Sequence, residues 1–291
     1  MLRTRLLMGA VLAALVVAVL LVDWAPWYPF LFVLLIVLSL AGCAEMVRLL
    51  GPNQQPSSWL CYAAIILLIC ANWVPHVPGP WDPDPWFWIG SAFAVAVVTA
   101  NVVEMARFRE PGGSVTHIAL TVWIVSYLGL LPSFFAQLRW LGPPGTSGTG
   151  EAGTAALALA VFVPKCGDIG AYFTGRLLGR HRMTPVLSPK KTWEGAAGGL
   201  VAAVLAAVGI DRLGPAAVLG ENAFFEIGFG ISAGVAGMLG DLAESLIKRD
   251  CQQKDASHVV PGFGGVLDVV DAVLFAAPVT YWWLRGVPLA A

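Results

Sequence analysis

The feature that most constrains this chain is a series of long apolar runs spread along its length. An α-helix needs about 20 mainly apolar residues to cross the hydrocarbon core of a bilayer. We expect about nine such helices, at 6–22, 30–47, 59–75, 86–105, 115–138, 154–174, 194–211, 224–246 and 265–284. The sequence therefore predicts an all-α polytopic integral membrane protein.

The balance of charged and apolar residues supports this fold class. Hydrophobic residues make up 58% of the 291 residues and charged residues only 12%, whereas an average soluble domain carries about 25% charged residues. A soluble fold could not cover its surface with so few charges, which excludes a soluble globular enzyme, and such a hydrophobic chain is not disordered. The net charge of −1 gives no general attraction to nucleic acid, so we expect no nucleic-acid partner.

The basic residues indicate how the predicted helices are oriented, because loops rich in Lys and Arg stay on the cytoplasmic side. With a cytoplasmic N-terminus, most of the 17 Lys and Arg residues fall inside, and segment 75–85, which has none, falls outside. The first apolar run follows Arg3 and Arg5, as in a signal peptide, but it lacks a clear cleavage site. We therefore predict an uncleaved first helix and a cytoplasmic N-terminus.

The Gly- and Pro-rich stretch 142–153 divides the chain into halves of different character. We interpret it as a flexible external loop. Residues 1–141 form N-terminal transmembrane helices with few internal charges, whereas residues 154–291 hold nearly all the unusual polar residues. We expect 154–291 to be the catalytic region, with its chemistry on the cytoplasmic side.

The first polar cluster lies within the apolar run 154–174. An ionisable group inside a membrane costs at least about 2.5–3.5 kcal/mol and needs a partner or a cavity. Lys165 and Asp168 are three residues apart on one helical face, so they are predicted to pair. Asp168, Tyr172 and Arg176 also share a face that points to the cytoplasmic end. The alternative is an ion pair that only fixes helix packing.

The second cluster is L-S-P-K-K-T-W-E-G at 187–195. Ser188 and the following proline interrupt the chain, and Thr192 is a candidate cap for a helix that starts at the next residue. A capped helix start beside Lys190 and Lys191 offers free backbone N–H groups and two cations, which is typical of a phosphate site. The alternative is an ordinary basic loop on the cytoplasmic side.

The third cluster spans residues 240–271 and carries the most acidic groups. On a helix, Asp241, Ser245 and Lys248 lie on one face, and Glu244 beside them can pair with Lys248. In this stretch, acidic and basic residues alternate at one membrane face. Such a mixture is expected where acids hold a metal ion and bases hold phosphates, as in phosphoryl or nucleotidyl transfer.

Two further aspartates, Asp268 and Asp271, share a face of the next predicted helix. Linker 250–264 is too short to cross the membrane, so both carboxylate sets should meet at the cytoplasmic end. Carboxylates without paired His or Cys ligands suit a hard cation such as Mg²⁺. Glu45 and Glu104, by contrast, lie near predicted helix ends in the N-terminal half, where we expect interfacial positions.

At these residues the sequence resembles the phosphatidate cytidylyltransferases, also called CDP-diglyceride synthetases. Their signature runs roughly S-x-x-K-R-x4-K-D-x-S-x-x-x-P-G-H-G-G-x-x-D-R-x-D. This chain matches it in unbroken register at Ser245, Lys248, Arg249, Lys254, Asp255, Ser257, Pro261, Gly262, Gly264, Gly265, Asp268 and Asp271. The D-x-G-A-Y-x-x-G-R and S-P-K-K-T-W-E-G segments are also similar to the family's. The chain departs from the signature at Phe263, where the family has histidine, and at Val269, where it has arginine.

The resemblance implies an activity: CTP and phosphatidic acid would give CDP-diacylglycerol and pyrophosphate. It also implies Mg²⁺ with room for a second cation, phosphatidic acid taken from the inner leaflet, a homodimer, and a place in the cell inner (cytoplasmic) membrane. Carried over residue by residue, it predicts metal binding by Asp241 and Asp268. It predicts catalytic roles for Lys248, Arg249, Lys254, Asp255 and Asp271. It predicts substrate binding by Asp168, Arg176, Ser188, Lys190, Lys191, Ser245, Gly264 and Gly265.

Four other interpretations stay open at this point. A transporter would use Lys165 and Asp168 as coupling groups, although we find no inverted repeat of the kind that many transporters have. A CTP-dependent kinase of lipid alcohols would need a general base and would release CDP. A CDP-alcohol phosphotransferase would need a D-G-x2-A-R type motif, which we do not find. The last is a catalytically weakened paralogue, because of the departures at Phe263 and Val269.

Overall fold

The computed structural model describes residues 2–51, 56–142, 150–220, 222–257, 259–262 and 264–286. Within these residues, eight helices are long and apolar enough to cross a membrane, and a shorter apolar helix covers Met8–Val22. The prediction of an all-α polytopic membrane protein is confirmed, and the cytoplasmic N-terminus stays a prediction. Most of the predicted loop 142–153, namely 143–149, lies outside the described residues, as does Phe263.

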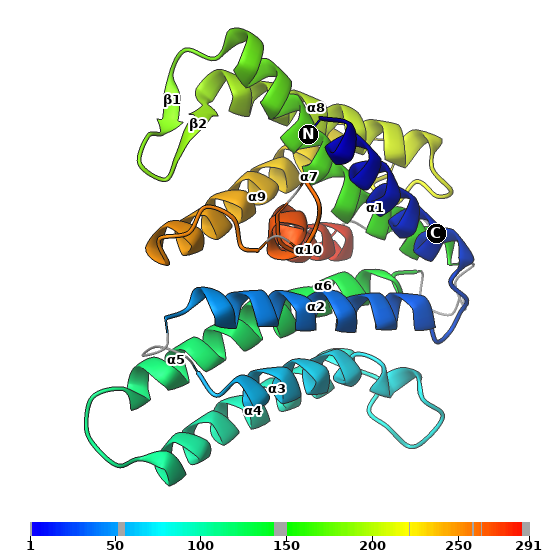
Figure 1. The fold of residues 1–291 in the computed structure, drawn as a ribbon. Helices are drawn as coiled ribbons and strands as arrows, with labels where there is room; N and C mark the ends of the chain where they lie inside the picture. The colour runs from blue at the N-terminus through cyan, green and yellow to red at the C-terminus, as the bar shows by residue number, and fades with distance from the viewer. Residues whose placement is uncertain are drawn as a thin grey trace. The chain divides into compact units, whose positions relative to one another are not determined.

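Figure 1 labels the α-helices and strands along the chain, and the short helical turns η2 and η3 lie between them. Their bounds, in order, are α1 (Leu2–Val22), α2 (Pro29–Leu49), α3 (Ser58–Ala71), η2 (Val74–His76), α4 (Pro85–Arg107), α5 (Ser114–Val125), η3 (Ser126–Leu130), α6 (Leu131–Leu138), α7 (Glu151–Leu178), β1 (Arg182–Thr184), β2 (Ser188–Thr192), α8 (Trp193–Leu213), α9 (Ala223–Asp250) and α10 (Leu267–Gly286).

The chain divides into two compact units. The first unit contains residues 1–137 and 255–267, and the second contains 138–254 and 268–291. The segment that carries much of the family signature, 255–267, therefore packs with the N-terminal helices rather than with the helices that flank it in sequence.

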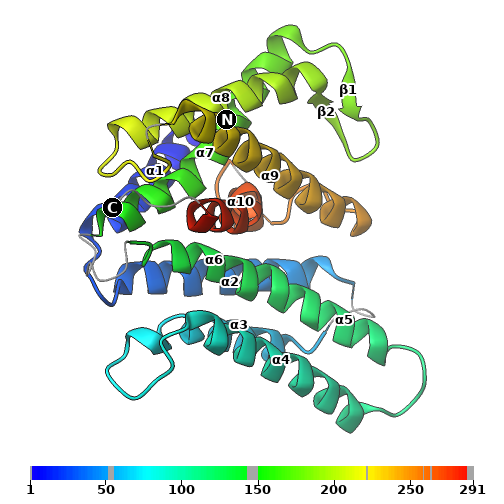
Figure 2. The same cartoon turned by 180° about the vertical axis from the view of Figure 1, so that it is seen from behind.

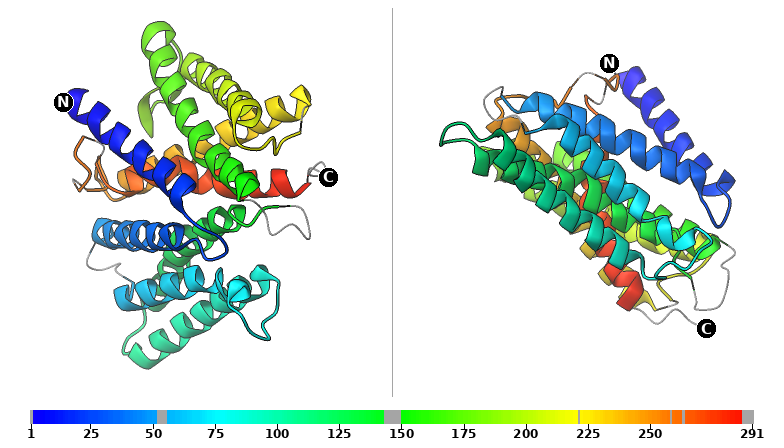
Figure 3. Two further views of the ribbon diagram at one scale, coloured as in Figure 1. Left: turned by 90° about the vertical axis from the view of Figure 1, so that its right-hand side faces the viewer. Right: turned by 90° about the horizontal axis from the view of Figure 1, so that it is seen from below.

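In the first unit, each of the helices α2 to α5 packs against the next one along the chain, and α5 also packs back against α3 (Figure 3). Small and branched apolar side chains such as Ala64, Leu68 and Ile89 fill the space between α3 and its neighbours. Polar groups also join the end of α3 to α6: Asn72 donates to Ser133 Oγ over 3.0 Å, and Gln137 donates to Asn72 Oδ1 over 2.9 Å. Buried amides need such partners, because an unpaired polar group inside a membrane protein is costly.

In the second unit, α7 and α8 pack closely along a seam of small residues. A Cβ atom on Gly199 would lie 2.9 Å from the carbonyl oxygen of Gly167, and one on Gly195 would lie 2.9 Å from that of Ala171. Small residues at such seams let two backbones approach within a membrane. Helix α9 packs against both α7 and α8, and α7 and α9 carry several of the polar residues of the C-terminal half, among them Lys165, Asp168 and Asp241.

A short antiparallel hairpin, β1–β2, connects α7 to α8 and is the one addition to the helical plan within the described residues (Figure 2). Glu194, in the first turn of α8, accepts bonds from the backbone N–H groups of Arg180 and His181 at 3.1 and 3.2 Å. Thr192 ends β2 and caps α8, as predicted, by accepting from the Gly195 N–H at 3.1 Å. The hairpin is thereby fixed to the start of α8.

Candidate active site

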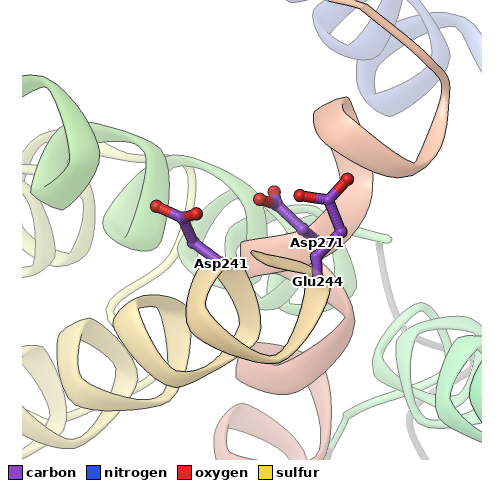
Figure 4. A group of neighbouring side chains, drawn as sticks. All are labelled: Asp241, Glu244 and Asp271. Carbon is purple, nitrogen blue, oxygen red and sulfur yellow. The ribbon is translucent and has the colours of Figure 1, made fainter. Parts of the chain in front are cut away.

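Three carboxylates from two helices meet in the second unit (Figure 4). Asp241 and Glu244 come from α9 and Asp271 comes from α10, and one oxygen of each lies within 4.8 Å of the others. The helices can approach because Gly240 has no side chain: a Cβ there would collide with the carbonyl of Asp271. Glu244 is 2% exposed and Asp271 is 6% exposed. This arrangement confirms that the two carboxylate sets meet.

Each of these carboxylates is close to a lysine. Lys191 Nζ lies 2.8 Å from Asp241 Oδ2. Lys165 Nζ lies 3.1 Å from Asp271 Oδ1, and Lys248 pairs with Glu244. Buried carboxylates that lie this close would repel one another strongly, so interleaved cations are needed to hold them together without a bound metal.

Two of the lysines also bind a second carboxylate. Lys165 Nζ lies 3.4 Å from Asp168 Oδ2, which confirms the pair predicted from their spacing on α7. Lys248 Nζ lies 2.6 Å from Asp268 Oδ1. Asp268 thus contacts the acidic group through Lys248, and its direct role as a metal ligand stays a prediction.

The acidic group has the donors that a hard cation requires. All three side chains offer carboxylate oxygens, which Mg²⁺ prefers. Glu244 Oε1 is buried and has no hydrogen-bond partner among the described residues. A buried acceptor left unpaired costs free energy, and a bound cation would satisfy it. The residues present therefore fit a Mg²⁺ ion.

A cavity of about 420 Å³ opens beside this group, within the usual size range of small-ligand sites. Its lining residues are Asp168, Ala171, Tyr172, Gly175, Arg176, Met183, Lys190, Lys191, Thr192, Gly195, Ala196, Met238 and Asp241. The predicted substrate residues Asp168, Arg176, Lys190 and Lys191 are thus brought together. Arg176 donates to the Tyr172 hydroxyl over 3.0 Å, so its guanidinium is held beside the cavity.

Other predicted residues of the second unit lie away from the cavity wall. Ser188 starts strand β2, and its carbonyl accepts from Thr184 Oγ1 at 3.4 Å. Ser245 and Arg249 follow the acidic group along α9, and Arg249 donates to the Gln253 carbonyl over 3.2 Å. Lys254 is exposed.

The remaining predicted residues, Asp255, Gly264 and Gly265, belong to the first unit. Asp255 is exposed. Gly264 has a φ of 111°, a backbone conformation that favours glycine. It exchanges two backbone hydrogen bonds with Val260, at 2.8 and 3.0 Å, which close a tight turn.

Glu45 on α2 is a polar residue whose position the sequence did not indicate. The expected interfacial placement stays a prediction, and the side chain is 2% exposed within the first unit. Its carboxylate accepts three hydrogen bonds from the signature segment, from Ser257 Oγ at 2.6 Å and from the N–H groups of Val266 and Leu267 at 2.9 Å. The only sequence signal was a single acid near the end of an apolar run, which does not identify a partner 212 residues away.

Comparison with known proteins gives consistent matches. Residues 3–287 match the cytidylyltransferase family. A phosphatidate cytidylyltransferase of Synechocystis sp. is 28% identical over 97% of this chain and 96% of its own length. One from Staphylococcus aureus is 30% identical over 70% of this chain and 72% of its own. One from Mycobacterium tuberculosis is 34% identical over 62% of this chain and 51% of its own. The family match extends over residues of both units.

Proposed function

This chain belongs to the cytidylyltransferase family, and we propose that it transfers the cytidylyl group of CTP to phosphatidic acid. A phosphate oxygen of the lipid forms a bond to the α-phosphorus of CTP, and the bond from that phosphorus to the bridging oxygen of the β-phosphate breaks. The products are CDP-diacylglycerol and pyrophosphate. Several curated relatives carry the name of this activity.

The observation that carries the proposal is that Asp241 belongs to both the acidic group and the cavity wall. A site for a metal-bound triphosphate needs oxygen ligands for the metal and cations for the phosphates at one place. Asp241 offers oxygen ligands for the metal. Its partner Lys191, together with Lys190 and Arg176, offers cations for the phosphates. The resemblance implies phosphate-binding roles for the same basic residues, which supports the proposal.

The chain's own residues would bind and neutralise charge rather than remove a proton. A phosphate monoester is already ionised at neutral pH, so the nucleophile needs no strong general base. The main obstacle is repulsion between two anions, which preorganised cations reduce in the transition state. Arg176, Lys190 and Lys191 are the groups available in the cavity. A Mg²⁺ ion held by Asp241, Glu244 and Asp271, with Asp268 as a further candidate, would neutralise phosphate charge in the same region.

The proposal includes the setting of the reaction. CTP is a cytoplasmic solute, so we place the cavity at the cytoplasmic face of the inner membrane and the N-terminus on the same side. A homodimer is carried over from the resemblance. Cysteine labelling of residues near the N-terminus in intact cells would test the orientation, and light scattering of the purified protein in detergent would test the dimer.

The test is a transfer assay on the full chain in detergent with phosphatidic acid, CTP and Mg²⁺. We expect CDP-diacylglycerol and pyrophosphate in equal amounts. Asp271→Asn should abolish both products, whereas the exposed Asp250→Asn at the end of α9 serves as the matched control and should retain activity. Release of CDP with a phosphorylated lipid would instead indicate a kinase. A folded protein that binds no CTP would refute the proposal.

A further inference from the structure

The carboxylate of Glu45 holds the signature segment 257–267 at both of its ends. Near the start, the Ser257 hydroxyl donates to Glu45 Oε1 over 2.6 Å. At the end, the N–H groups of Val266 and Leu267 donate to Oε1 and Oε2, each over 2.9 Å. One side chain from α2 thus accepts three hydrogen bonds from this segment. We call these three hydrogen bonds the Glu45 clasp.

The clasp also caps helix α10, which begins at Leu267. The first N–H groups of a helix lack partners within it, and an anion beside them is favoured by the helix dipole. A cap normally comes from a neighbouring residue in sequence, whereas this one comes from 222 residues away. The N–H group of Leu267, the first residue of α10, is therefore satisfied by a residue of α2 within the first unit.

The described glycines of the segment fit closely around the clasp. A Cβ atom on Gly265 would lie 2.5 Å from Glu45 Oε2, so a side chain there would push the carboxylate away. Gly262 and Gly264 have φ values of 85° and 111°, which shape the turn between the two ends of the clasp. The turn brings the Ser257 hydroxyl and the Leu267 N–H to one carboxylate.

The residue held by the clasp is the direct neighbour of a predicted metal ligand. Leu267 is joined by a peptide bond to Asp268. Asp268 Oδ1 lies 2.6 Å from Lys248 Nζ, and Lys248 also pairs with Glu244 of the acidic group. A continuous series of bonds and contacts therefore leads from the clasp to a candidate metal ligand.

We propose that Glu45 is a positioning residue for the cytidylyl transfer: it fixes the backbone at Leu267 and so fixes Asp268, and through Lys248 it keeps Glu244 in place for the metal ion. This inference rests on the proposed function. Residues that orient the ligands of a metal site without binding the metal commonly lower metal affinity or activity by about 10–100-fold when they are replaced. Glu45 acts through other residues and is not itself a catalytic residue.

A role in stability alone predicts a different result. If the clasp only stabilised the fold, its loss would lower the fraction of active protein and leave the metal dependence of the remaining molecules unchanged. If it positions Asp268, the active molecules themselves should bind the metal more weakly. The concentration of Mg²⁺ that gives half-maximal activity separates these cases, and so does direct Mn²⁺ binding followed by electron paramagnetic resonance.

The experiment compares Glu45→Gln with Glu104→Gln in the full chain in detergent. Glu104 lies on α4 of the same unit, and its side chain contacts His117 at 3.5 Å rather than the signature segment, so it is the matched control. Gln offers only one acceptor oxygen where Glu45 uses two. In Glu45→Gln we expect faster hydrogen exchange across 257–267. The Mg²⁺ concentration that gives half-maximal activity should rise at least about 5-fold, and the affinity for Mn²⁺ should fall by about 10-fold. Glu104→Gln should match the wild type in all three.

Two further variants keep the test decisive if Glu45→Gln does not fold. Ser257→Ala removes one bond of the clasp and should shift the Mg²⁺ dependence by a smaller factor, about 2-fold to 3-fold. Glu45→Asp keeps the charge on a shorter side chain and should restore part of the metal affinity.

The outcomes that overturn the inference are distinct. Unchanged exchange in Glu45→Gln would show that the clasp does not hold the segment. Faster exchange with wild-type Mg²⁺ dependence and Mn²⁺ affinity would show that holding it does not affect the site. A wild-type protein without transfer activity would refute the proposed function, and the Mn²⁺ measurement would still decide between a clasp that supports metal binding and one that does not.

Discussion

Replacing Lys248 by Met should destabilise the protein strongly, because two buried carboxylates would lose their shared cation. Lys248 is 9% exposed and lies between Glu244, which is 2% exposed, and Asp268. Removing one partner of a buried ion pair typically costs about 3–5 kcal/mol, mostly from the uncompensated charge that remains. Met fills a similar volume, so little of the effect should come from a cavity.

We take the lower limit of about 3 kcal/mol, since Asp268 is not completely buried. For a chain of this size a loss of 1 kcal/mol lowers the melting temperature by roughly 2–4 °C, so the expected decrease is about 6–12 °C. The assay is thermal unfolding in detergent with EDTA, because a divalent cation bound at the acidic group would compensate for the missing lysine.

The neighbouring cation provides the control. Arg249 is exposed and donates a hydrogen bond to the Gln253 carbonyl, so Arg249→Met should change the free energy of unfolding by less than about 0.5 kcal/mol. Lys248→Arg keeps the charge and should recover part of the loss. If Lys248→Met melted within 2 °C of Arg249→Met, the carboxylates would not depend on this cation and the reasoning would be refuted.

Three further outcomes are expected. Chelation of divalent cations should abolish the transfer reaction and added Mg²⁺ should restore it; activity that persists in EDTA would exclude the metal role proposed for Asp241. Gly240→Val should separate α9 from α10, lower the free energy of unfolding by about 1–3 kcal/mol and abolish the activity. Gly209→Ala on α8, where a Cβ meets nothing within 4 Å, should be tolerated. Thermal melts followed by circular dichroism compare the two variants. Thr192→Ala should remove the cap of α8, which should lower the free energy of unfolding by about 1 kcal/mol and raise the KM for CTP. Thr192→Ser should keep the stability and the KM of the wild type. An unchanged KM in Thr192→Ala would show that the cap does not contribute to substrate binding.

The parts of the site that the sequence predicted are those governed by helical periodicity. The pairs Lys165–Asp168 and Glu244–Lys248 are separated by three and four residues, and both are present. Thr192 was recognised as a cap because the residue type and the following helix are adjacent in sequence. Once a helix is predicted correctly, residues three or four positions apart are known to lie next to each other on one of its faces.

Contacts between helices could not be predicted in the same way. Lys165 reaches Asp271 across 106 residues, and Lys191 reaches Asp241 from a hairpin that was not predicted. Apolar faces of transmembrane helices resemble one another, so hydropathy does not show which helix packs against which. Glu45 illustrates the consequence: its surroundings are set by the packing of α2 against a segment from the far end of the chain.

The arrangement of the lysines has a consequence for how the chain enters the membrane during synthesis. Helix α7 is made well before α10, so Lys165 must cross the insertion machinery long before Asp271 exists. Asp168 on the same helix already neutralises it, and Lys248 likewise travels with Glu244 on α9. An isolated charge at the centre of a bilayer is penalised by about 2.5–3.5 kcal/mol even on insertion scales, and each of these helices carries its own counter-ion, which stays paired in the folded protein. The contacts of Lys165 with Asp271 and of Lys248 with Asp268 are then added to these pairs, so each lysine has a counter-ion before α10 is made.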